Sequence, residues 1–98
     1  MYHSKMETAV IDRFFDAMLT LRSRDEFYRF FDDVATAGEL GDMAQRFEVA
    51  ELLAEGGRYN AIVEKTGAST ATISRVNKCL QYGADGYKLV IRRLGRKE

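Results

Sequence analysis

Apolar residues recur at three- and four-residue steps along most of this chain, in short segments that glycine, serine or threonine interrupt. This spacing gathers side chains on one face of an α-helix, and no segment shows the sustained two-residue alternation of a β-strand. Hydrophobic residues make up 46% and charged residues 31% of the 98 positions, which is typical of a soluble helical domain. The pattern predicts an all-α fold with about six helices.

Helix boundaries are marked by capping residues. Ser23 stands three residues before Glu26, the spacing of a capping box, and Thr36 and Glu39 repeat it. Glycines at 56–57 are expected to end a helix, because glycine adopts the left-handed cap at least cost, and glycines at 67 and 83 are expected to break the helices that follow. The approximate bounds expected from these signals are residues 5–21, 24–35, 38–54, 59–65, 69–80 and 84–95.

The chain is short enough to be one domain, residues 1–98. Within it we expect dimerisation and core helices over 5–57, a helix-turn-helix over 58–80 and a C-terminal helix over 84–95. Three phenylalanines at positions 27, 30 and 31 need cover that so small a domain does not easily supply. We therefore predict a homodimer, the alternative being that these helices fold back on their own chain.

Several classes of protein are disfavoured. No apolar run is long enough to span a membrane, and the first residues lack the apolar stretch of a signal peptide. One histidine and one cysteine leave too few soft ligands for a zinc site, so no metal is expected. The lone Cys79 is expected to be a small buried packing residue, with a redox role as the alternative. The default compartment is the reducing cytoplasm.

Charge is distributed unevenly although the total is zero. Residues 1–57 carry six basic and twelve acidic side chains, and residues 58–98 carry nine basic and three acidic ones. The basic half includes a C-terminal group of Arg92, Arg93, Arg96 and Lys97. Such asymmetry suggests an anionic partner, most commonly nucleic acid, although the two halves could also neutralise each other.

The segment YNAIVEKTGASTATISRV, residues 59–76, has the layout of a helix-turn-helix: two short helices around a turn containing glycine. Gly67 supplies the positive φ that the turn needs. The positions at which the two helices must press together hold Ile62, Ala68, Ile73 and Val76.

The second helix of this segment is polar on its other side. Hydroxyls and cations come from Ser69, Thr70, Thr72, Ser74, Arg75 and Lys78. Short donors of this kind suit a recognition helix in the major groove of double-stranded DNA. The alternative is a solvated helical hairpin, but serine and threonine are mediocre helix formers and this many together favours DNA binding.

Residues 67–75, GASTATISR, closely resemble the reading head of the tryptophan repressor, and residues 5–95 resemble the YerC/YecD group of repressor-related bacterial proteins. The resemblance implies an intertwined homodimer that reads half-sites about one helical turn, roughly 34 Å, apart. It places Asn60, Thr70, Ala71 and Thr72 towards bases and Ser74 towards the backbone or groove.

The resemblance also implies a corepressor pocket, in which this chain departs from the tryptophan repressor. Arg75 corresponds to one ligand-contacting arginine, whereas Gln45 replaces the second. Val76 replaces the glycine that makes room for the indole ring, and its side chain would project into the slot. We therefore expect no response to L-tryptophan; another small-molecule corepressor stays open, and no other cofactor is predicted.

The sequence thus predicts a DNA-binding transcriptional regulator that binds a palindromic operator. Repression is the expected mode, because no activation surface is evident. The alternative is a dimeric protein-interaction module that keeps the helix-turn-helix as a scaffold. An enzyme is not expected, because no nucleophile, base and orienting group can be assembled from the chain.

Overall fold

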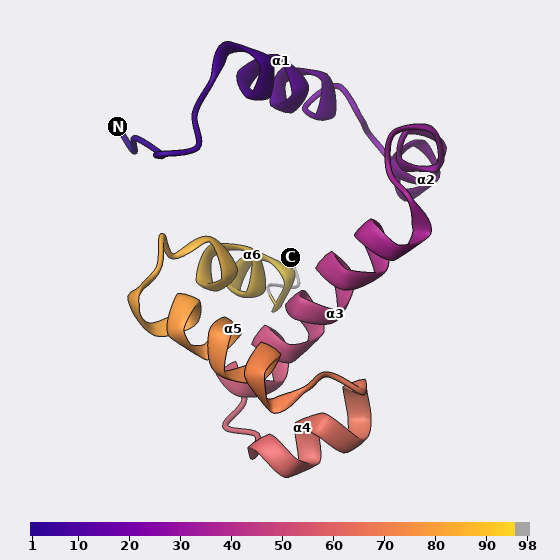
Figure 1. The fold of residues 1–98 in the computed structure, drawn as a ribbon. Helices are drawn as coiled ribbons and strands as arrows, with labels where there is room; N and C mark the ends of the chain where they lie inside the picture. The colour runs from indigo at the N-terminus through magenta and orange to yellow at the C-terminus, as the bar shows by residue number, and fades with distance from the viewer. Residues whose placement is uncertain (96–98) are drawn as a thin grey trace. The chain divides into compact units, whose positions relative to one another are not determined.

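The computed structural model describes residues 1–95, which contain six helices and no strand (Figure 1). Their bounds are α1 Ala9–Met18, α2 Arg24–Val34, α3 Ala37–Ala54, α4 Tyr59–Thr66, α5 Thr70–Tyr82 and α6 Gly86–Gly95. The predicted all-α class is confirmed. The chain divides into two compact units, a first unit of Met1–Ala37 and a second unit of Gly38–Glu98, and each is described by itself.

Helix α1 is shorter at both ends than the predicted range of 5–21. The Thr8 hydroxyl accepts a hydrogen bond from the amide of Ile11 at 3.1 Å, so the helix begins only after this cap. At the other end, the amide and hydroxyl of Thr20 both donate to the carbonyl of Ala17, at 3.1 and 2.7 Å. These local bonds replace the helical pattern, which the apolar periodicity alone did not indicate.

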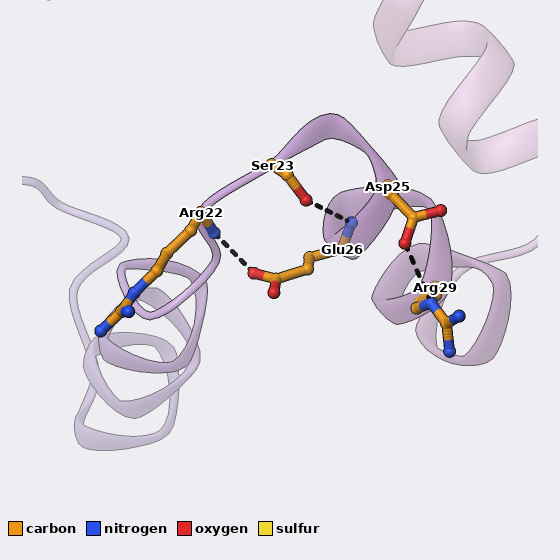
Figure 2. Close-up of polar contacts among 5 residues, drawn as sticks. All are labelled: Arg22, Ser23, Asp25, Glu26 and Arg29. Carbon is orange, nitrogen blue, oxygen red and sulfur yellow. Dashed lines mark hydrogen bonds and ion pairs between the residues drawn. The ribbon is translucent and has the colours of Figure 1, made fainter.

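Helix α2 begins with the predicted capping box (Figure 2). The Ser23 hydroxyl accepts from the amide of Glu26 at 3.1 Å, and the Glu26 carboxylate accepts from the amide of Arg22 at 2.7 Å. The carboxylate therefore satisfies the amide one residue before the cap. Asp25 and Arg29 pair at 3.1 Å on the exposed side, where such a pair adds little stability.

Apolar side chains of the first unit are only partly covered. The rings of Phe14 and Phe30 join α1 to α2 with centroids 5.8 Å apart. Neither helix contains a buried residue, and Phe15 and Phe27 are 55% and 39% exposed. Within one chain, the aromatic face predicted to need cover is therefore not fully covered.

The second unit has a compact core beneath the α4–α5 turn. Val49 and Ala50 of α3 contact residues of α4, the turn and α5, and all of these are at most 2% exposed. The cluster comprises Val49, Ala50, Ile62, Ala68, Ile73 and Val76, with Tyr87 and Ile91 of α6 packed against it. Burying each large aliphatic side chain here stabilises the fold by about 1.5–3 kcal/mol.

Helix α3 ends in a double hydrogen-bonded cap at the predicted glycine pair. Gly56, with φ 87°, donates to the carbonyl of Leu53 at 3.0 Å, and Gly57 donates to the carbonyl of Leu52 at 2.9 Å. This is a Schellman motif, which satisfies two terminal carbonyls and turns the chain towards α4.

Other boundaries differ modestly from expectation. Helix α5 extends to Tyr82 rather than about Leu80. The prediction that Cys79 is buried is wrong, because the buried face of α5 runs through Ile73, Val76 and Leu80 and leaves Cys79 exposed. Arg92 and Arg93 lie in the last turn of α6, whereas Arg96 and Lys97 lie outside the described residues.

Gly57→Ala is expected to lower the free energy of unfolding by about 1–3 kcal/mol. A Cβ at this position would lie 2.8 Å from the carbonyl oxygen of Leu52, a backbone atom that cannot move without disturbing the cap. Urea denaturation monitored by circular dichroism measures the change.

The matched control is Gly41→Ala, within α3, where a new Cβ would meet nothing within 4 Å. This substitution is expected to stabilise by about 0.5–1 kcal/mol, because alanine is the better helix former. Equal effects of the two substitutions would contradict the assignment of Gly57 to a close backbone approach.

Candidate nucleic-acid interface

Helices α4 and α5 pack against each other around a tight turn, as the helix-turn-helix layout predicts. Gly67 takes the left-handed conformation, with φ 74°, and its amide donates to the carbonyl of Val63 at 2.9 Å. The four predicted contact positions, Ile62, Ala68, Ile73 and Val76, are all buried. Apolar contact between the two helices therefore fixes the turn from inside.

The turn is also fixed by hydrogen bonds. The Thr66 hydroxyl donates to the carbonyl of Ile62 at 2.7 Å and accepts from the amide of Ala68 at 3.1 Å. The Ser69 hydroxyl caps α5 by accepting from the amide of Thr72 at 3.1 Å. The end of α4, the turn and the start of α5 thus form one bonded unit.

An exposed face of α5 combines small and basic side chains. Ala71, Ser74, Arg75 and Lys78 recur at three- and four-residue steps, and all are exposed. They lie opposite the face of α5 that carries its buried residues. We call these four residues the α5 outer face; it combines two short side chains, Ala71 and Ser74, with two cations, Arg75 and Lys78.

The remaining predicted DNA-contacting residues lie at the two helix starts. Thr70 is exposed in the first turn of α5, and Thr72 is half-buried. The hydroxyl of Thr72 accepts from the Ser69 hydroxyl at 3.1 Å, and its own O–H is still a donor. Ser69 instead uses its O–H in that bond and its oxygen in the cap, so its first role is structural. Asn60 is exposed on α4 and accepts from the amide of Ala61 at 2.9 Å.

Carboxylates are absent from the first turns of both α4 and α5. The positive end of a helix dipole at α5 is therefore not countered by an acidic side chain of its own first turn. By contrast, α2 carries Asp25 and Glu26 at its start. The starts of α4 and α5 are therefore more favourable than the start of α2 for an anion such as phosphate.

The three residues predicted to line a corepressor pocket lie in different surroundings. Val76 is 1% exposed within the core, whereas Arg75 is exposed on the α5 outer face. Gln45 of α3 is half-buried, and its side-chain amide donates to the carbonyl of Thr66 at 3.1 Å. This bond to the turn was not predicted, because residues 21 positions apart in sequence give no local signal for it.

A cavity of about 550 Å³ in the second unit is lined by other, mostly apolar residues. They are Phe47, Cys79, Gly83, Ala84, Gly86, Tyr87 and Val90. Within the described residues 1–95, no group of three or more His, Cys, Asp or Glu side chains is placed to hold a metal ion. The same part of the chain holds no helix long and apolar enough to cross a membrane.

These features define an all-α protein with a helix-turn-helix. Residues 9–95 match the family model described as Trp repressor protein, and the chain belongs to this regulatory, non-enzymatic family. It is 47% identical to YerC, an uncharacterized protein of Bacillus subtilis, over 94 residues that cover 96% of this chain and 90% of the relative.

Two crystal structures resemble it closely. A TrpR-like protein from Eubacterium eligens is 53% identical with a TM-score of 0.89, covering 96% of this chain and 97% of the other. A Trp repressor candidate from Staphylococcus aureus is 44% identical with a TM-score of 0.89, covering 95% and 93%. The resemblance to the tryptophan repressor and to YerC-type proteins predicted from the sequence is confirmed.

L-tryptophan is expected not to bind tightly. Val76 fills the position where the resemblance requires space, and Gln45 offers no guanidinium to a ligand carboxylate; each loss is worth about 1–3 kcal/mol. Together they amount to at least about thirtyfold in affinity. Isothermal titration calorimetry measures this directly, with a thermal-shift titration as a second readout. A dissociation constant in the micromolar range would contradict the expectation.

Proposed function

We propose that this protein is a transcriptional regulator that binds double-stranded DNA through α4 and α5 and acts as a repressor by occupying a palindromic operator. The observation that carries the proposal is the α5 outer face, together with the carboxylate-free helix starts beside it. Such a regulator acts in the bacterial cytoplasm, where the chromosome lies.

The side chains on this surface suit the major groove. Arg75 and Lys78 supply cations for guanine edges or phosphates, and the hydroxyls of Thr70 and Ser74 reach either kind of acceptor. Ala71 contributes a methyl group in place of a longer side chain, which allows the helix to approach the base edges closely. Asn60, at the start of α4, carries an amide that suits adenine or a phosphate.

Electrostatics supports the same partner. Residues 58–98 carry nine basic and three acidic side chains, so the half that contains α4 and α5 attracts a polyanion. None of the exposed residues of the α5 outer face is acidic. A protein partner would need no such bias, and this favours DNA over the alternative of a scaffold for protein interactions.

We further propose that the protein acts as a homodimer. The first unit leaves Val10, Phe15 and Leu19 at least half exposed, although such residues gain most from burial. The second unit contributes an apolar cavity of its own. A second copy of the chain is the occupant that would cover both surfaces, and two reading heads would then engage half-sites about one helical turn apart.

Replacing Thr72 and Arg75 together by alanine is expected to weaken operator binding by at least about tenfold, because a lost base contact costs about 1–3 kcal/mol. The operator is first obtained by selecting a random duplex pool with the wild-type protein. Affinity is then measured by fluorescence anisotropy at near-physiological salt.

Arg29→Ala is the matched control, because it removes the same charge from an exposed arginine of α2. It is expected to leave affinity for the operator unchanged. Enrichment of no sequence by the wild-type protein, either alone or with cell extract added, or equal binding by the double variant, would sink the DNA-binding proposal and favour the scaffold alternative.

Light scattering is expected to give about twice the chain mass of 11.2 kDa. Replacing both Val10 and Phe15 by glutamate is expected to yield monomers, because these side chains are 79% and 55% exposed in a single chain. Arg13→Glu, on the same helix, changes the net charge equally and should leave the dimer intact. A wild-type monomer at micromolar concentration would refute the dimer.

A further inference from the structure

We propose that Gln45 is a positioning residue that holds the helix-turn-helix on α3, so that the DNA-binding surface is set without a small-molecule effector. This inference rests on the proposed function, since it concerns how the same surface is kept in place. Its starting point is the 3.1 Å hydrogen bond from the Gln45 side-chain amide to the carbonyl of Thr66.

Thr66 is the residue through which such a bond has most effect. Its carbonyl belongs to the end of α4, where the last carbonyls of a helix lack partners within the helix. Its hydroxyl meanwhile bonds the carbonyl of Ile62 in α4 and the amide of Ala68 in the turn. A donor from α3 to Thr66 therefore restrains α4 and the turn together, and through Ala68 it restrains the start of α5.

Apolar packing also holds α5 on α3. Val76 and Ile73 of α5 are 1% and 0% exposed in the core that they share with Val49 and Ala50 of α3. The space between α3 and α5 at this cluster is thus filled by side chains of the chain itself. Apolar packing does not specify rotation or sliding closely, whereas a directional hydrogen bond does. Gln45 supplies that direction.

The two contacts together make a ligand unnecessary for order. A small molecule orders a mobile segment only by binding its ordered form more tightly than its other forms. Here the hydrogen bond from Gln45 to Thr66 and the buried side chain of Val76 already favour the ordered form. The reading helix is therefore held in its binding arrangement in the free protein.

Two near-isosteric substitutions separate the hydrogen bond from the volume of the side chain. Gln45→Met keeps the length of the side chain and removes the donor. Gln45→Glu keeps the shape, removes the donor at neutral pH and restores one when the carboxyl is protonated. The control is Gln81→Met, because Gln81 is an exposed α5 residue whose amide bonds only Asn77 of its own helix among the described contacts.

Two readouts are measured on the full-length protein: operator affinity and amide exchange at Ala68. Gln45→Met and Gln45→Glu are expected to bind the operator about tenfold more weakly at neutral pH, the loss typical of one hydrogen bond in each of two reading heads. The Ala68 amide should exchange about three- to tenfold faster. As the pH falls into the titration range of glutamate, the Gln45→Glu deficit relative to wild type should shrink, while that of Gln45→Met should persist.

Effector independence is tested on wild-type protein that has been unfolded in denaturant, dialysed and refolded, which removes bound metabolites. It is expected to bind the selected operator with unchanged affinity. A requirement for cell extract, or equal operator affinity for wild type and both Gln45 variants, would overturn the inference. These outcomes differ from failure of the proposed function, in which wild-type protein binds no operator with or without extract.

Discussion

Contact between α3 and the α4–α5 pair is the interaction on which the second unit depends. Val49 and Ala50 of α3 are fully buried, and Ile62, Ile73 and Val76 pack in the same cluster with almost no exposure. Because these side chains occupy the interior, the polar residues of α5 are left on its outer side. The exposed face of α5, which is the proposed DNA-binding surface, is therefore a consequence of how the core is filled.

Hydrogen bonds supply what apolar packing leaves undetermined. The turn contains Gly67 in the left-handed region, Thr66 bonded on both sides and Ser69 as the cap of α5. Each satisfies backbone groups that would otherwise need water in a tight corner. The bond from Gln45 adds the one connection that comes from outside the pair of helices. Order in the turn thus derives from three neighbouring residues, Thr66, Gly67 and Ser69, and one distant side chain.

Local signals in the sequence predicted the local features of the structure. The four contact positions of the helix pair, the conformation of Gly67, the Ser23–Glu26 box and the glycine pair after α3 were all predicted, because each depends on neighbours a few residues away. The ends of α1 were predicted poorly, since competing threonine bonds decide them. The exposure of Cys79 and the partner of Gln45 were missed for another reason: both depend on which tertiary neighbour lies opposite, and no spacing rule encodes that.

Opposite charge in the two halves of the chain has a consequence for how such a regulator would search a chromosome. With zero net charge, the whole molecule has little attraction to a distant polyanion, and beyond about 8 Å salt screens what remains. Attraction would develop only at close range, where the basic side chains of residues 58–98 meet phosphates, whereas the acidic side chains of residues 1–57 would be repelled. For the proposed regulator, non-specific adhesion to the large excess of non-operator DNA would thereby be weakened, and a larger share of the protein would stay unbound and available to its operator.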